Sequence, residues 1–171
     1  MKKVMPLAKI LELVQRAKKA GKIIVTTNGC FDILHVGHVQ YLTEAKALGD
    51  ILIIGMNSDA SVRRNKGPLR PIVPERERAQ LLAALEAVDA VFIFDDKTPM
   101  PWLSKIKPHV HVKGGDYANI DKMIERETVE KGGGRVALAR LAKNKSTTKV
   151  IAKIVKAYGS HTSNSRGRVG K

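Results

Sequence analysis

Two histidines separated by two residues are the most chemically suggestive feature of the sequence. His35 and His38 flank Gly37 in the stretch His-Val-Gly-His, where a loop is expected to enter a helix. Imidazole N–H groups can donate hydrogen bonds to phosphate oxygens there, and the free amides and positive dipole of a helix start favour the same ligand. Gly37 has no Cβ, so a ligand or the neighbouring backbone can approach closely. The motif therefore predicts a phosphate-binding site.

The loop that precedes the histidines allows further interpretations. Asn28 and Gly29 form a turn whose amides can also face an anion. Cys30 or Asp32 could complete a metal site with the two histidines, and the histidines could equally be a structural pair that caps the turn. Cys30 could be a nucleophile, but a cysteine after glycine is as easily a small packing residue. The stretch is neither a Gly-x-Gly-x-x-Gly fingerprint nor a Walker P-loop.

Short apolar runs alternate with segments of helical periodicity along the chain, and these elements must position the histidines. Strands are expected at 22–27, 51–56, 90–94, 110–113 and 135–138, and helices at 7–17, 38–48, 75–87, 99–107, 120–130 and 149–157. The basic stretch 61–74, which holds Gly67 and three prolines, is expected to be a loop. This alternation predicts an α/β fold, a Rossmann-like doubly wound parallel five-stranded sheet with helices on both faces.

In such a sheet, ligands bind beyond the carboxyl ends of the strands, at the switch point in strand order. The segments that follow the expected strands are 28–38, 57–66 and 114–117, together with the approach to Ser146. The unusual residue clusters of the chain all lie in these segments. We therefore expect a single site.

The chain carries 31 Lys+Arg and 16 Asp+Glu, which gives a net charge of +15. This charge favours an anionic partner. The net charge is +6 over residues 1–22, −2 over 23–98, +8 over 99–159 and +3 over 160–171. The excess thus lies outside the part that holds the histidines, and we interpret it as a solvated surface, with nucleic acid disfavoured as a partner. One cysteine and no 18-residue apolar run predict a cytoplasmic protein that does not span a membrane.

Several motifs resemble those of the nucleotidylyltransferase superfamily. The His-Val-Gly-His element after a first strand, with Ser146-Thr147-Thr148 opening the last helix, marks the superfamily. Within it, the chain is similar to the adenylyltransferase domain of bacterial ADP-heptose synthases over about residues 22–156. The shared stretches are Thr-Asn-Gly-Cys-Phe-Asp at 27–32, Asn-Ser-Asp at 57–59, Lys-Gly at 66–67 with Arg-Pro at 70–71, Leu-Glu-Ala-Val-Asp at 85–89 and Lys-Gly-Gly-Asp-Tyr at 113–117.

This resemblance implies transfer of AMP from ATP to D-glycero-β-D-manno-heptose 1-phosphate, which gives ADP-heptose and pyrophosphate for the lipopolysaccharide core. A phosphate oxygen would attack the α-phosphorus in line, with Mg²⁺ accompanying ATP. Many relatives carry a fused sugar kinase. The implied organisation is an N-terminal amphipathic helix at 1–21, a nucleotidylyltransferase domain at 22–158 and a flexible basic tail at 159–171.

The resemblance also implies roles for individual residues. The catalytic residues would be His35, His38 and Lys66, with no protein ligand to a metal. The nucleotide-binding residues would be Asn28, Gly29, Cys30, Phe31, Gly37, Arg78, Lys113, Gly114, Gly115, Asp116, Ser146, Thr147 and Thr148. The substrate-binding residues would be Asp32, Asn57 and Asp59.

Plainer interpretations stand beside four of these roles. Arg78 could be an exposed helix arginine, the two glycines after the fourth strand a simple turn, and Ser146 an ordinary helix cap. Asp32 could orient either its loop or the acceptor.

Three other functions remain open from the sequence. A glycerol-3-phosphate cytidylyltransferase usually carries Arg-Thr-x-Gly-Ile before the final Ser-Thr-Thr, whereas this chain has Leu-Ala-Lys-Asn-Lys at 141–145. A flavin-nucleotide-forming enzyme of the same superfamily is a further alternative. A basic nucleic-acid-binding module is the alternative that is not an enzyme. A homodimer could form through the N-terminal helix if that helix does not pack on its own sheet.

Overall fold

A five-stranded parallel sheet forms the centre of the molecule. The computed structural model describes residues 2–115, 120, 123–140 and 146–159. The strands are β1 (Ile24–Gly29), β2 (Ile51–Asn57), β3 (Ala90–Phe94), β4 (Val110–Gly114) and β5 (Arg135–Ala139), in the order β3-β2-β1-β4-β5. The chain first builds outward from β1 through β2 to β3 and then returns to add β4 on the other side of β1. The switch point therefore lies between β1 and β4.

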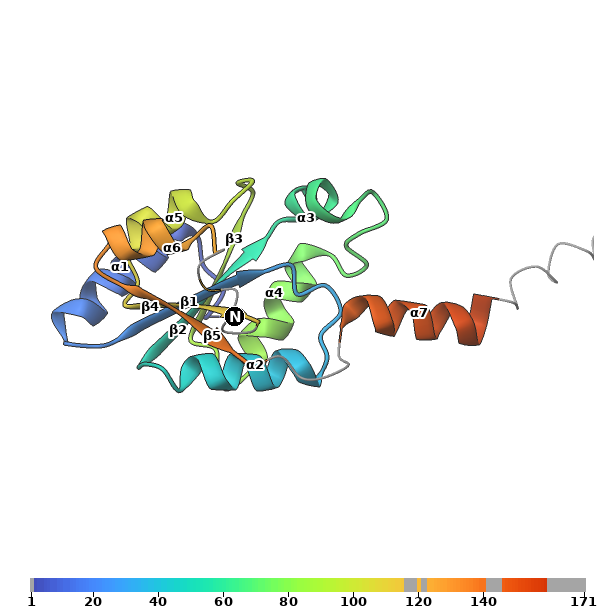
Figure 1. Cartoon of the computed structure of the whole chain (residues 1–171), viewed down its shortest axis with the longest axis horizontal. Coiled ribbons are helices and arrows are strands. Elements are labelled where there is room, and N and C mark those ends of the chain that lie inside the picture. Colours follow the sequence, from blue (N-terminus) through green and yellow to red (C-terminus); the bar gives the residue numbers. More distant parts are fainter. Residues whose placement is uncertain (1, 116–119, 121–122, 141–145, 160–171) are drawn as a thin grey trace, which may run out of the picture.

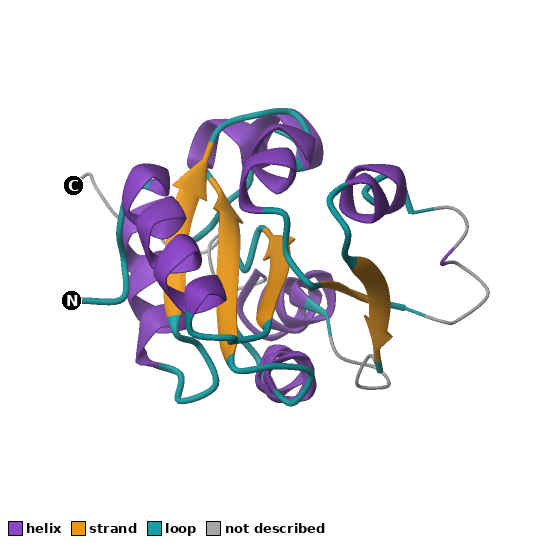
Figure 2. Ribbon diagram, turned by 90° about the vertical axis from the view of Figure 1, so that its left-hand side faces the viewer, coloured by secondary structure: helices purple, strands orange, loops and turns teal. Residues whose placement is uncertain are grey.

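Helices cover both faces of the sheet (Figures 1 and 2). On one face, α1 (Leu7–Lys19), α5 (Met100–Ile106) and α6 (Arg126–Lys131) enclose a core that contains Trp102. On the other face, α2 (Val36–Lys46) and α4 (Glu75–Ala84) pack over Leu52 and Ile54. The strands are apolar on both faces because both are covered. The predicted doubly wound α/β fold is confirmed.

The N-terminal segment belongs to this same body. Ile10, Val14 and Ala17 of α1 are buried against the sheet. Val4 forms a parallel bridge with Val91, so the segment before α1 covers the outer edge of β3. An edge strand with unpaired backbone groups would otherwise be open to other chains. The amphipathic face of α1 is thus used within its own domain.

Three boundaries differ from those expected from the sequence. Part of the stretch expected as a loop at 61–74 is helical, because α3 spans Asp59–Lys66. The Ser58 hydroxyl caps α3 by accepting from the Ser61 amide, and only Ser61 and Val62 are buried in it, so no strong apolar period marks this helix. The helix expected at 75–87 ends at Ala84, and α6 begins at Arg126 rather than near 120.

The last helix, α7 (Thr147–Tyr158), extends away from the body of the domain (Figure 1). None of its residues is buried, and Ile154, Val155 and Tyr158 are at least half exposed. Its N-terminus nevertheless reaches the switch point, where the Thr147 hydroxyl donates to the carbonyl of Ile33 at 3.4 Å. Of the tail expected at 159–171, Gly159 is described as the C-cap of α7, and residues 160–171 lie outside the described residues.

Candidate active site

A cavity of about 380 Å³ opens at the switch point, between the starts of α2 and α7. Its wall is made by Asn28, Gly29, Cys30, Phe31, His35, Gly37, His38, Tyr41, Lys113, Gly114, Ser146 and Thr147. They come from the ends of β1 and β4 and from the first turns of the two helices. The single site expected from the sequence is therefore assembled from segments far apart in the chain.

The two histidines form a stacked pair at the start of α2. Their ring centroids are 3.9 Å apart with an interplanar angle of 22°. His35 is the N-cap residue, and its backbone N–H donates to Nδ1 of His38 at 3.3 Å. Because Nδ1 of His38 accepts, the proton of the neutral ring is on Nε2. The first turn of the helix thus fixes which nitrogen of His38 can donate to a ligand.

Burial lowers the pKa of His38 to about 4, and the neighbouring His35 contributes to the same shift. His38 is therefore neutral at pH 7 in the absence of a ligand. A neutral imidazole with its proton on Nε2 is a hydrogen-bond donor that need not lose its proton to act. An anion in the cavity would favour the protonated form and raise this pKa.

The loop before the histidines has an unusual backbone at Phe31. Its φ is 48°, in the left-handed region that large side chains seldom adopt. The Phe31 ring is buried, and it lies 5.5 Å from the ring of His38. A Cβ at Gly29 would come within 3.1 Å of the Phe31 ring, so the glycine leaves room for this packing. Such strain is typical of segments that hold a functional group in place.

Cys30 contributes its thiol to the cavity wall but is not activated. Burial raises the pKa of the thiol, and the nearby charges of Lys66, Arg78 and Arg70 oppose part of this rise. The Sγ atom faces Oδ1 of Asn57 at 3.9 Å. A thiol whose pKa is raised remains protonated near neutral pH, which supports the interpretation as a packing residue.

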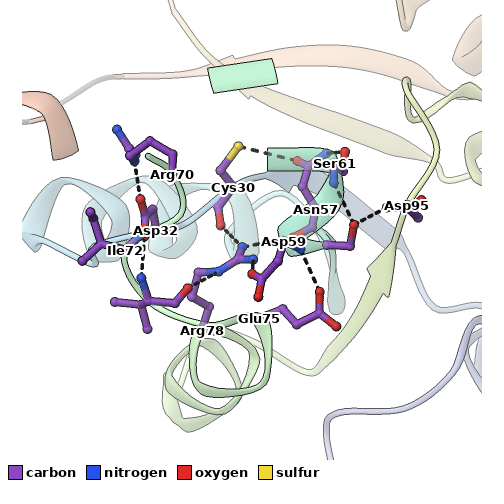
Figure 3. Close-up of polar contacts among 12 residues, drawn as sticks. Cys30, Asp32, Asn57, Asp59, Ser61, Arg70, Ile72, Glu75, Arg78 and Asp95 are labelled. Carbon is purple, nitrogen blue, oxygen red and sulfur yellow. Dashed lines mark hydrogen bonds and ion pairs between the residues drawn. The ribbon is translucent and has the colours of Figure 1, made fainter. Parts of the chain in front are cut away.

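Asp32 holds a loop and lies outside the cavity wall. Its carboxylate is almost completely buried and accepts from the backbone amides of Ile72 and Val73 at 2.7 and 2.9 Å. It also pairs with Arg70 (Figure 3). Of the two roles that the sequence left open for Asp32, these contacts describe the orientation of the loop.

Arg78 is completely buried and does not line the cavity. Its guanidinium donates to the carbonyls of Cys30, Asn57 and Val73 and pairs with Asp59 at 2.6 Å (Figure 3). All these contacts are to protein groups. The structure therefore corrects the idea of an exposed helix arginine, and it places the guanidinium behind the site, where it joins the ends of β1 and β2.

Asn57 and Asp59, expected to bind substrate, are engaged within the protein. The Asn57 amide donates to the Ser61 hydroxyl at 2.9 Å. The Asp59 backbone N–H donates to the Glu75 carboxylate at 2.7 Å, and its own carboxylate holds Arg78. Both residues join α3 to the sheet and to α4. Neither contributes to the wall of the cavity.

The expected phosphate end of the cavity is the start of α7. The Ser146 hydroxyl accepts from the Lys149 amide at 3.2 Å, so it caps the helix as well as lining the cavity. Thr147 lines the cavity beside it, whereas Thr148 is exposed and does not. Backbone amides at such a start suit a bound phosphate. Capping and phosphate binding are compatible here.

Two other described residues expected from the sequence are not in the wall. Lys66 is exposed at the end of α3, although its charge acts on the Cys30 thiol. Gly115 lies just beyond β4. Asp116, also expected to bind the nucleotide, lies outside the described residues. Tyr41, in contrast, was not expected in the wall, although it lies one turn after His38 on the same face of α2. This helical spacing from His38 is the feature of the sequence that could have predicted Tyr41 as a wall residue.

The part of the chain that the structure describes contains no group of three or more His, Cys, Asp or Glu side chains that could hold a metal ion. Within that same part, no helix is long and apolar enough to cross a membrane.

Comparison with known proteins identifies the family of the chain. A cytidylyltransferase-like family profile matches residues 26–154, and the chain belongs to that family, whose members are nucleotidylyltransferases.

Individual relatives are more specific. The chain is 50% identical over 157 residues to the bifunctional protein HldE of Geobacter sulfurreducens, a match that covers 92% of this chain and 32% of that protein. It is 51% identical over 146 residues to HldE of Pelobacter propionicus, covering 85% and 30%. The chain thus spans about a third of the length of these relatives. The solved lipopolysaccharide core biosynthesis protein of Thermoplasma volcanium is 33% identical with a TM-score of 0.57, covering 73% of this chain and all of that one.

Proposed function

We propose that this nucleotidylyltransferase transfers AMP from ATP to D-glycero-β-D-manno-heptose 1-phosphate and releases pyrophosphate. The observation that carries the proposal is the composition of the cavity. Every residue of its wall except Tyr41 belongs either to the superfamily motifs or to the stretches shared with the heptose branch, and six of them belong to the latter: Asn28, Gly29, Cys30, Phe31, Lys113 and Gly114. Identity of about 50% to the HldE proteins supports the same branch.

The reaction needs orientation and charge stabilisation more than covalent chemistry. A phosphate oxygen of the sugar attacks the α-phosphorus of ATP. The bond between the α-phosphorus and pyrophosphate breaks on the opposite side. No enzyme nucleophile is required, because the attacking group is already an anion. We place the transferring phosphoryl group beside the two histidines. His38 donates to it from Nε2, and His35 lies stacked against His38. Such preorganised donors stabilise the charge that develops in the transition state.

The remaining phosphates would lie against the start of α7. Ser146, Thr147 and the first amides of that helix offer hydroxyl and N–H donors to the β- and γ-phosphates. Lys66 would reach the same phosphates from the end of α3, as a mobile cation close to Cys30.

Magnesium fits this arrangement as a companion of ATP. Mg²⁺ is usually held by substrate phosphates and water with few protein ligands, so the hydroxyl oxygens of Ser146 and Thr147 in the described wall are compatible with it. It would supply partial neutralisation of the triphosphate charge. The residues nearest to that charge would be Ser146 and Thr147.

The test is pyrophosphate release with ATP or CTP, each combined with heptose 1-phosphate or glycerol 3-phosphate. We expect turnover only with ATP and heptose 1-phosphate. Turnover restricted to CTP and glycerol 3-phosphate would replace this function with the cytidylyltransferase alternative. If no pair reacts and duplex DNA binds with a steep dependence on salt, the protein is the nucleic-acid-binding module instead.

We infer a cytoplasmic location, because a nucleoside triphosphate is the substrate and Cys30 is the only cysteine. We also infer that a homodimer, which the sequence suggested through the N-terminal helix, would use α7. The apolar face of α1 is covered by its own sheet, whereas Ile154, Val155 and Tyr158 of α7 are at least half exposed. Light scattering of wild-type protein and a Val155→Glu variant tests this: a monomeric wild type, or a variant that stays dimeric, would contradict it.

A further inference from the structure

A buried carboxylate lies beside Lys113, a residue of the cavity wall. Glu125 is only 4% exposed, and it precedes α6 without belonging to any motif identified from the sequence. Its Oε1 lies 2.8 Å from Nζ of Lys113, which lines the cavity at the end of β4. A buried charge requires a partner, and the partner of Glu125 is Lys113, a residue of the cavity wall.

The contacts of Lys113 limit what it can offer to a ligand. Its ammonium has three N–H donors. One is donated to Oδ1 of Asn28 at 3.0 Å, and the ammonium also forms an ion pair with Glu125. These two contacts hold the ammonium at the cavity wall and leave at most two N–H groups for a ligand.

The charge of Lys113 is also balanced by this partner. Glu125 is close enough to the cavity for its charge to help raise the pKa of Tyr41, although burial is the main cause. The Lys113–Glu125 pair is thus neutral as a unit. A polyanion gains little beside this neutral pair, whereas an N–H of an ammonium held by two contacts suits an uncharged acceptor such as a ring nitrogen, a carbonyl or a hydroxyl.

The starts of α2 and α7 differ from the Lys113–Glu125 pair. They present amides and hydroxyls to the cavity, with Lys66 near Cys30, and the described part of the wall contains no carboxylate. The two regions therefore differ in the ligand they favour, one for phosphate and one for a neutral group. A ligand with both parts, such as ATP, is given one orientation.

We propose that Glu125 is a positioning residue that neutralises and aims Lys113, so that the nucleoside end of ATP lies there and the triphosphate lies at α7. This inference rests on the proposed function. If Glu125 loses its charge, Lys113 becomes an uncompensated cation, and the triphosphate gains a second place to bind. ATP bound in that reversed orientation cannot react.

The test compares Glu125→Gln with Glu127→Gln as a matched control. Glu127 carries the same group on α6 and pairs with Lys131 at the exposed surface, away from the cavity. In Glu125→Gln, we expect kcat and the KM for ATP to fall by the same factor, about five-fold, because unproductive binding lowers both and leaves kcat/KM unchanged. We expect inorganic tripolyphosphate to bind about five-fold more tightly than to the wild type. Glu127→Gln should match the wild type.

A double variant separates this role from a structural one. The Lys113→Met/Glu125→Gln double variant carries no charge at this position, and the wild-type pair is neutral in sum, so the tripolyphosphate affinity of the double variant should match that of the wild type. If Glu125→Gln lowers kcat/KM, or weakens tripolyphosphate binding with or without Lys113, Glu125 only supports the fold and the proposal is overturned. Unchanged kcat, KM and tripolyphosphate affinity in Glu125→Gln would also overturn it.

Two further results complete the design. Should Glu125→Gln not fold, the Lys113→Met/Glu125→Gln double variant should weaken binding of adenosine and leave tripolyphosphate binding unchanged; the reverse pattern would overturn the proposal. If the wild type releases no pyrophosphate from any substrate pair, the proposed function itself is wrong. If the wild type is active and Glu125→Gln behaves like it, only the inference about Glu125 is wrong.

Discussion

Replacement of Arg78 by methionine should destabilise the whole domain. Methionine fills much of the same space but donates no hydrogen bond, so the carbonyls of Cys30, Asn57 and Val73 and the Asp59 carboxylate lose their partner. A buried acceptor left unsatisfied costs about 1–3 kcal/mol. The Asp59 side chain is 26% exposed, so water replaces part of what it loses.

We therefore expect Arg78→Met to lower the free energy of unfolding by about 4–6 kcal/mol, a large part of the total for a domain of this size. Urea unfolding followed by the fluorescence of Trp102, the only tryptophan, measures this change. Arg76→Met is the matched control, because Arg76 is exposed on the same helix. We expect that control to stay within about 0.5 kcal/mol of the wild type.

The result that would refute this reasoning is a specific one. If Arg78→Met unfolds at the same urea concentration as Arg76→Met while the KM for ATP rises ten-fold or more, the guanidinium contacts the nucleotide. The buried position described above would then be wrong for the working enzyme. Arg78→Lys should fall between the wild type and Arg78→Met in stability, because an ammonium keeps the charge but cannot reach all four acceptors.

Three further predictions concern the site, the pH response and the core. His38→Ala should lower turnover about a hundred-fold or more with an unchanged melting temperature; retained turnover with early melting would mean that the histidine is only structural. His111 is buried with a pKa lowered to about 3, so its neutral form stabilises the fold, and this stability should be lost as pH falls from about 6.5 towards 3. His111→Phe should flatten that part of a stability–pH curve, and an identical curve would contradict the assignment. Gly55→Ala should lower the unfolding free energy by about 1–3 kcal/mol in urea, because its Cβ would lie 2.8 Å from the Trp102 ring; an unchanged midpoint would contradict this packing.

The residues of the cavity wall could be predicted because they follow strands of a recognisable parallel sheet. Alternation of apolar runs and helical periods is a local property, and the carboxyl ends of neighbouring parallel strands must meet at one edge. His35, Lys113 and Thr147 could therefore be expected near one another without any knowledge of side-chain contacts. The structure confirms that they share a cavity.

The partners of those residues could not be predicted in the same way. Arg78 and Asp32 carry charges that are usually exposed, and only the packing of α4 and the 70–73 loop makes them buried supports of the site. Glu125 pairs with Lys113 from a segment just before α6 that no sequence motif marks. Helix α3 was missed because its residues favour a solvated surface and its apolar contacts are few. In each case the deciding interaction lies between segments distant in sequence.

The strand order has a consequence for how the site comes into being. β1, β2 and β3 follow one another in the chain and pair with one another, whereas β4 must return to β1 from 85 residues away, the separation of Asn28 and Lys113. The contact of Thr147 with Ile33 spans 114 residues. A chain that emerges from a ribosome at its N-terminus can therefore form half of the sheet while the cavity has only its histidine wall. The ability to bind substrate is acquired late in folding, so a bound nucleotide stabilises the last segments to assemble and cannot guide the first.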